Sequence, residues 1–364
     1  MKTKISVYQM FAAMILHPLG STILFFLTPE AKQDAWIAML VYIPAGILLQ
    51  LIYTTLYYQY PDDTIVTYLP KIFGRFIGYI LSIVYITYFA YLAARVLRDF
   101  AELSLIAIMP ETPLIVASAM FMSAIAYTVF TGLENLARAA QIALPISIFV
   151  FITEYALLFV TPGVVKFDNL KPVLENGIIH VIKAGWLLIT FPFGETVTFA
   201  MIYPSVNEPS KVRKAAFMAI IFEGILLTVN TIIYIASLGI NFATTALFPL
   251  LETLRLIKVG FIERLDILLV VIMALGGLFK ISIFMYASML GTAQLIKLKD
   301  PKYLALPFGI GIIIFSILIA KNYPQHIQLG LEWTPVYIHI PIQIIIPVSA
   351  LIVHFIKKWI SLSK

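Results

Sequence analysis

The chain contains no cysteine among its 364 residues, which excludes disulfide bonds, thiol nucleophiles and thiolate metal sites. Its five histidines are dispersed, and none forms the H-x-x-x-H or H-E-x-x-H spacing that directs two imidazoles to one metal. Charged residues make up only 12% of the sequence, and the basic ones form no block despite a net charge of +6. We therefore expect no cofactor, no metal site and no nucleic-acid partner.

Apolar residues are in large excess, at 61% of the chain. That balance is typical of an all-α polytopic membrane protein embedded in the lipid bilayer. A spanning helix needs about 20 mostly apolar residues, and the sequence contains ten such runs joined by short connections. The predicted spans are 7–28, 36–58, 75–104, 112–130, 137–161, 178–203, 214–239, 265–294, 303–320 and 335–357.

Lysine and arginine are unequally divided between the two sets of loops. An even number of spans puts both termini on one side, and that side collects 14 of the 25 basic residues. Nine lie on the opposite side, while Arg95 and Lys280 fall inside predicted helices. The excess predicts that both termini are cytoplasmic.

The sixth apolar run is interrupted at its centre by residues 191–196, which read F-P-F-G-E-T. Pro192 removes a backbone donor, and Gly194 makes a non-helical backbone accessible. Glu195 is costly at bilayer depth unless it faces protein, water or a ligand. The first run has a matching interruption at residues 17–22, H-P-L-G-S-T. Each interruption alone could be a proline kink, but two at corresponding positions favour broken helices around a midplane binding site.

The proline and glycine of the two breaks lie 174 residues apart, which is close to half the chain. Five helices per half is an odd number, so a second copy of the unit must enter the membrane from the other side. We therefore predict one transmembrane domain, 1–364, built from inverted repeats of about 7–161 and 178–357.

Ionisable residues within predicted spans are candidates for function. Arg95 and Asp99 share one face of the third helix at i,i+4 spacing, which predicts an ion pair. This face either turns into the bundle or lies in water at the outer end of the helix. Glu154 and Glu223 have no evident partner in the sequence and could be buried and neutral.

Lys280 lies deep in the eighth span, on a face shared with Gly276 and Gly277 that suits close helix packing. Ser282 and Tyr286 lie on the other side and could point to a cavity. Lys280 either stands where a transporter holds a cation or pairs with a buried carboxylate, and we favour pairing. The candidate partners are Glu154, Glu195 and Glu223.

The connection 244–266 is amphipathic, with its apolar positions on one side. The helical part of this connection begins after a proline-bearing turn at residues 248–249. We expect a helix on the outer surface that could cover the entrance to the binding site. Its apolar side is formed by Leu247, Leu250, Leu251, Leu254 and Ile257.

Several of these motifs together resemble one family. They are Tyr8-Gln9, Gly20-Ser21-Thr22, the F-P-F-G-E stretch at 191–195, and E-R-L-D at 263–266 with Lys280 downstream. In these features the chain resembles the B subunits of bacterial spore germinant receptors, which belong to the amino acid–polyamine–organocation transporter superfamily. The resemblance covers essentially the whole chain, and the F-P-F-G-E stretch is its most specific part. It implies a LeuT-type fold of two inverted five-helix repeats with helices 1 and 6 broken.

The same resemblance implies a location in the spore inner membrane and a complex with an A subunit and a lipoprotein C subunit. It also implies a small nutrient, often an amino acid, held between the first and sixth helices and flanked by helices 3 and 8. Bulky residues at Gly20 and Gly194 are expected to fill that site, whereas Glu195 either senses the ligand or ties the broken helix to Lys280. The implied ligand-binding residues are Gly20, Ser21, Thr22, Val96, Phe193, Gly194, Glu195, Ser282 and Tyr286. Residues for ion pairing or coupling are Lys280, Glu154, Glu223, Arg95 and Asp99.

Two functions remain open at this point. The chain is either a nutrient-sensing receptor subunit that triggers germination or a secondary active amino acid transporter coupled to H⁺ or Na⁺. The fold alone cannot separate them. An enzyme is not expected, because the sequence shows no nucleophile–base constellation, metal cluster or phosphate-binding loop.

Overall fold

The computed structural model describes residues 4–258 and 266–362. In this part of the chain the structure is almost entirely helical, and an isolated parallel β-bridge joins Ile5 to Val206. The α-helices are α1 (Val7–Leu19), α2 (Ala35–Gln59), α3 (Ile65–Phe73), α4 (Arg75–Ala107), α5 (Leu114–Phe130), α6 (Leu133–Val160), α7 (Gly177–Ala184), α8 (Val212–Leu238), α9 (Ile240–Thr245), α10 (Pro249–Leu254), α11 (Asp266–Leu295), α12 (Ala305–Leu318), α13 (Tyr323–Gln328) and α14 (Ile346–Leu362). Short 3₁₀ segments include η1 (Thr22–Leu24), η2 (Pro29–Asp34), η3 (Phe167–Leu170), η4 (Trp186–Ile189) and η5 (Phe193–Met201), and π-helical turns form η9 (Leu329–Trp333) and η10 (Pro335–Ile345).

Within these ranges, eight helices are long and apolar enough to cross a membrane, and the bent pair Gly177–Ala184 and Trp186–Met201 makes a ninth. The apolar helix Leu114–Phe130 is shorter than the rest. Each predicted span therefore has a helical counterpart, although the count of ten itself stays a prediction. The bundle also exposes large apolar side chains, such as Phe149 and Leu318, as expected for a surface in contact with lipid.

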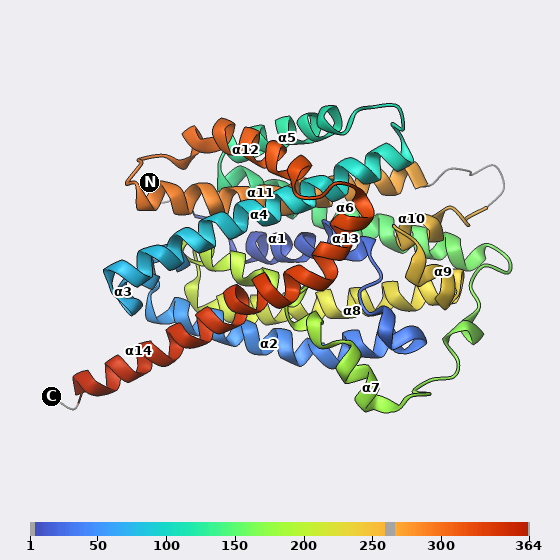
Figure 1. Cartoon of the computed structure of the whole chain (residues 1–364), viewed down its shortest axis with the longest axis horizontal. Coiled ribbons are helices and arrows are strands. Elements are labelled where there is room, and N and C mark those ends of the chain that lie inside the picture. Colours follow the sequence, from blue (N-terminus) through green and yellow to red (C-terminus); the bar gives the residue numbers. More distant parts are fainter. Residues whose placement is uncertain (1–3, 259–265, 363–364) are drawn as a thin grey trace.

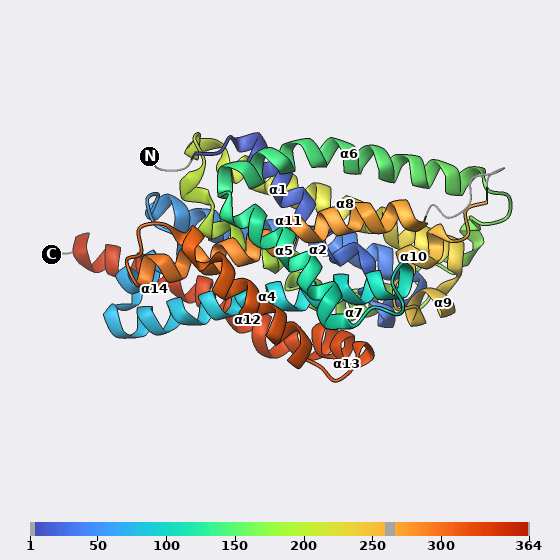
Figure 2. The same ribbon diagram turned by 90° about the horizontal axis from the view of Figure 1, so that it is seen from above.

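The long helices run roughly along the bundle axis, with α1 in its interior (Figures 1 and 2). α4 and α11 pack along each other, as do α2 and α8, and α1 contacts α6, α8 and α11. The beginning of α1 and the end of α14 lie toward one end of the bundle, here called the terminal end. α7 and α9 lie toward the other, here called the far end.

The first predicted break is present. Ser6 and Gln9 start α1 with reciprocal side-chain caps. The helix ends at Leu19, one residue after Pro18, and Ser21 adopts a non-helical backbone with φ −161° and ψ −31°. One 3₁₀ turn follows, and the chain then becomes extended.

The second break is also present. α7 and the segment Trp186–Met201 meet at an angle of 47°, and the segment itself consists of two 3₁₀ stretches separated at Thr190 to Pro192. Residues 193–201 of the second stretch are all buried. Both interruptions lie in the bundle interior. The elements that contain them, α1 and η5, contact α11, and residues of both breaks line one cavity with residues of α4.

The connection predicted as one amphipathic helix is different in the structure. It contains two short helices, α9 and α10, separated by an extended turn at Ala246 to Phe248. Leu250, Leu251, Leu254 and Ile257 are buried as predicted, whereas Leu247 is exposed. α10 packs on α8, α11 and η1, so it covers the end of the first broken helix. Residues 259–265, including most of the E-R-L-D motif, lie outside the described residues.

Candidate functional site

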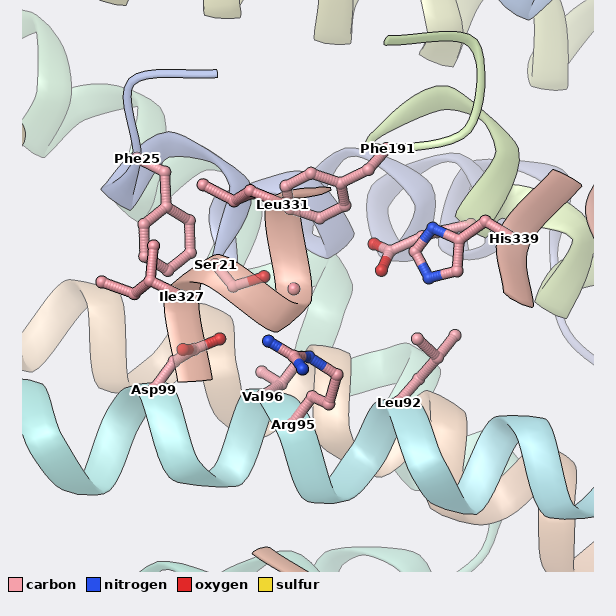
Figure 3. A pocket seen from close by; sticks show the side chains of 12 residues that line it. Ser21, Phe25, Leu92, Arg95, Val96, Asp99, Phe191, Ile327, Leu331 and His339 are labelled. Atoms are coloured by element: carbon pink, nitrogen blue, oxygen red, sulfur yellow. The ribbon is translucent and has the colours of Figure 1, made fainter. Parts of the chain in front are cut away.

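A small cavity lies where the two breaks face α4 (Figure 3). Its volume is about 40 Å³, which gives room for roughly three water molecules. Ser21 reaches it from the first break, Phe191 and Glu195 from the second, and Val96 from α4. The remaining wall comes from the α13–η10 region through Ile327, Gly330, Leu331 and His339, with Phe25, Leu92, Arg95 and Asp99 completing it.

A buried ion pair joins the two breaks. The Nζ of Lys280 on α11 lies 2.7 Å from Oε2 of Glu195 and donates a hydrogen bond of 2.8 Å to Oγ of Ser21. Lys280 also lies 5.3 Å from the ring centroid of Phe191, a distance at which an ammonium group is attracted by the aromatic face. Lys280 has no exposed surface and Glu195 is 3% exposed. The pair therefore ties both broken helices to α11.

The second set of charges lies on α4. Asp99 accepts a hydrogen bond of 3.2 Å from the hydroxyl of Tyr323, and its Oδ1 lies 3.1 Å from Nε2 of His326. Arg95 donates from Nη2 to the carbonyl of His326 at 2.6 Å. Arg95 and Asp99 are both buried, so this face of α4 turns into the bundle. The predicted Arg95–Asp99 ion pair is not formed, because partners on α13 take both side chains instead.

Comparisons with known proteins identify the family of this chain. A family model described as "Spore germination protein" matches residues 4–324. Spore germination protein KB of Bacillus subtilis (strain 168) is 38% identical over 359 residues, which cover 98% of this chain and 96% of that protein. The chain belongs to the spore germination protein family. Spore germination protein GerQB of Bacillus cereus is 25% identical over 93% of this chain and 94% of its own length.

Two solved structures share the fold of this spore germination protein. MhsT in complex with L-phenylalanine has a TM-score of 0.68, with coverage of 98% of this chain and 99% of MhsT. Mhp1, a transporter of the nucleobase–cation symport family with bromovinylhydantoin bound, has a TM-score of 0.63, with coverage of 91% of this chain and 75% of Mhp1. Both are only 11% identical to this chain, so they show the fold alone. The predicted LeuT-type architecture, in which the first span (α1) and the sixth span (α7 to η5) are broken, is thereby confirmed.

The cavity includes only part of the ligand-binding set expected from the sequence. Ser21, Val96 and Glu195 line it. Gly20 instead packs against α11, where a Cβ would come within 2.5 Å of Lys280 Cβ and 2.7 Å of the Gly276 carbonyl oxygen. Thr22, one residue beyond Ser21, is fully buried away from the cavity wall.

Phe193 and Gly194 also turn away from the cavity. The ring of Phe193 packs on Gly46 of α2, and a Cβ at Gly194 would come within 2.1 Å of Oε1 of Gln343. Bulky residues at Gly20 or Gly194 would therefore disrupt helix packing rather than fill the ligand site. Neither glycine lines the cavity, and their contact with a ligand stays a prediction.

The expected contribution of α11 also changes. Ser282 and Tyr286 are buried but do not line the cavity, whereas Lys280 reaches Ser21 and Glu195 from α11. Glu154 and Glu223, the other candidate partners of Lys280, are buried on α6 and α8 without an ion pair in the described part of the chain. Of the three candidate carboxylates, Lys280 pairs with Glu195.

Sequence reasoning missed the contribution of the α13–η10 region. Nothing in the sequence marks Ile327, Gly330, Leu331 or His339 as residues of a site. The evenly spaced prolines at 335, 341 and 347 are the one feature that points to irregular helix here. The segment is π-helical, a geometry that is frequent at functional sites but cannot be read from hydropathy.

A wider vestibule of about 380 Å³ lies at the far end, next to the cavity. Phe25, Ile327 and Leu331 line both spaces, so these three side chains separate them. Glu30 and Glu332 are the charged residues on the vestibule wall. We call Phe25, Ile327 and Leu331 the apolar gate.

Truncation of the gate should open the cavity to solutes. The native chain has no cysteine, so Val96→Cys provides a single reactive group on the cavity wall. We expect a small membrane-impermeant thiol reagent to label it slowly, and severalfold faster once Phe25→Ala is added. Ile142→Ala, on the exposed surface of α6, is the matched control and should not change the rate. Equal labelling with and without Phe25→Ala would show that Phe25 does not close the cavity.

Proposed function

We propose that this chain is the nutrient-sensing subunit of a spore germinant receptor and that its ligand is an amino acid bound between the two broken helices. The observation that carries the proposal is the cavity at both breaks, where Arg95, Asp99 and Glu195 stand among apolar side chains, in a chain of the spore germination protein family. Ser21, Val96 and Glu195, with Arg95 and Asp99, are the proposed ligand neighbours. In MhsT, which shares the fold, the bound molecule is L-phenylalanine.

The proposed mechanism starts from the size of the cavity. Because about 40 Å³ suffices for only a few water molecules, an amino acid must bind a more open conformation. The ligand then shifts the protein toward the open conformation by the difference between its affinities for the open and the closed conformations. The broken helices carry the change, since Lys280 connects both breaks to α11.

The change in conformation is proposed to pass to an A subunit and a lipoprotein C subunit in the spore inner membrane. In this setting both termini are cytoplasmic, as the excess of basic residues on their side predicts. The far end, with its vestibule and gate, then faces away from the cytoplasm. Nutrient would reach the cavity from that side.

Ligand binding is tested on the purified chain in detergent, screened against the twenty amino acids and common sugars by thermal unfolding. We expect one amino acid or a small related group to stabilise the protein, by about 2.7 kcal/mol at a concentration 100-fold above Kd. Spores that lack the chain should lose germination in response to the same compounds. A chain that no nutrient stabilises, together with unchanged germination of those spores, would contradict the proposal.

The alternative is a secondary active transporter, which the shared fold with Mhp1 and MhsT favours. Proteoliposomes that contain only this chain distinguish the two functions. A receptor subunit should bind the stabilising amino acid without accumulating it, with or without an H⁺ or Na⁺ gradient. Concentrative uptake would make the chain a transporter.

A further inference from the structure

Two opposite charges on α4 face the cavity without neutralising each other. Arg95 and Asp99 are one helical turn apart, a spacing at which such side chains commonly pair. Both are nearly buried, at 9% and 6% exposed. Their close contacts are instead with neutral oxygens and with the imidazole of His326. Figure 3 shows both side chains rising from α4 toward Ser21 and the second break.

Gly330 holds the guanidinium in this position. A Cβ at this residue would come within 2.0 Å of Nη2 of Arg95 and 2.8 Å of its Cζ. The guanidinium therefore packs directly on the backbone of η9, within reach of the carbonyl of His326. Any side chain larger than glycine must displace it. Gly330 thus acts as a positioning residue for Arg95.

The other charged groups of the cavity are already engaged. Lys280 contacts both Glu195 and Ser21, so the polar side chains at the two breaks share one partner on α11. Arg95 has five N–H donors, and among residues 4–258 and 266–362 its hydrogen bonds go to the carbonyl of His326 and, at 3.5 Å, to the hydroxyl of Tyr91. Buried charges are ordinarily paired because of the cost of removing them from water. A ligand that carries both charges would supply the missing partners.

We propose that Arg95 binds the carboxylate of a zwitterionic amino acid, and that Asp99, with Tyr323 and His326 beside it, receives the ammonium group. The planar guanidinium can hold a carboxylate with two parallel hydrogen bonds. The ligand's charged ends then bind α4, and its side chain is left to the breaks and the apolar gate. This inference rests on the proposed function and assigns the residues that bind the two charged ends of the nutrient.

The test uses the purified full-length chain and each of the twenty L-amino acids beside its primary amide, with D-glucose as an uncharged nutrient. Affinities come from thermal unfolding or calorimetry. The amide keeps the ammonium group and loses the carboxylate. We expect the acid to bind on the order of 10- to 100-fold more tightly than its amide, since hydrogen bonds to charged groups contribute about 1.5–3 kcal/mol.

Arg95→Gln should remove most of this preference for the acid over the amide. Gly330→Ala should reduce it too, although the arginine remains. Arg98→Gln is the matched control, because Arg98 lies on the same helix, pairs with Glu102 at 2.7 Å and does not line the cavity. It should leave the preference unchanged. If Arg95→Gln does not yield folded protein, Arg95→Lys tests the same point, since an ammonium group lacks the planar fork and should give an intermediate preference.

Equal binding of acid and amide by the native chain would overturn the inference, as would an Arg95→Gln protein that keeps the native preference. Binding of glucose alone would overturn it and leave nutrient sensing intact. Absence of any binding would overturn the inference, and only together with unchanged germination of spores that lack the chain would it overturn the proposed function as well.

Discussion

Replacement of Lys280 by methionine is expected to destabilise the protein by about 3–5 kcal/mol, because Glu195 is then left buried and unpaired. Both side chains lie in the interior, 2.7 Å apart, and Ser21 loses its donor at the same time. The measurement is thermal unfolding in detergent, together with the amount of folded protein in membranes. A fall in both is the expected result.

The double replacement Lys280→Met with Glu195→Gln separates pairing from packing. With neither charge present, most of the lost stability should return, because a buried pair replaced as a whole is often nearly neutral. Lys302→Met serves as the matched control, since Lys302 pairs with Asp300 at the surface and should change little. A single Lys280→Met protein as stable as the native one would show that the pair does not hold the breaks together.

Gly20→Ala should have the second large effect. The added methyl group would overlap Cβ of Lys280 at 2.5 Å and the backbone oxygen of Gly276 at 2.7 Å. A backbone oxygen cannot rotate away, so α1 and α11 must separate. We expect a loss of about 3 kcal/mol, toward the upper end of the usual cost of overpacking, and weaker nutrient binding because Lys280 moves. Unfolding midpoints and binding by the same purified protein measure both effects.

Gly311→Ala is the control for that experiment. It makes the same change on α12, where a Cβ meets nothing within 4 Å. Its stability should stay the same or rise by up to about 1 kcal/mol through helix propensity. If the two alanine variants were equally stable, close contact between the first break and α11 would not be a requirement of the fold.

Much of the architecture was readable from the sequence because its causes are local. Long apolar runs specify membrane helices, and Pro18 and Pro192 remove helical hydrogen bonds wherever they occur. Pairing between Glu195 and Lys280 was among the possibilities because few buried groups can neutralise a lysine. The number of spans is not determined in the same way, because the helix Leu114–Phe130 is shorter than the others and does not reach the length of a membrane span.

The directions of side chains at the second break could not be predicted in the same way. The stretch Phe193–Met201 is 3₁₀-helical, with about three residues per turn rather than 3.6. The resemblance assigns three consecutive residues to the ligand, but consecutive residues of such a turn point in different directions, and Glu195 lines the cavity while Phe193 and Gly194 do not. The contact of Arg95 with the carbonyl of His326 could not be predicted either, because the two residues lie 231 positions apart in the chain.

The β-bridge at the terminal end limits how the two broken helices can move. Ile5, just before α1, accepts a backbone hydrogen bond of 2.9 Å from Asn207 and donates one of 2.8 Å to Ser205, just after the second broken helix. These two hydrogen bonds hold the two broken helices together at the terminal end of the bundle. While both hydrogen bonds stay intact, the two broken helices can move relative to each other only by tilting about this end.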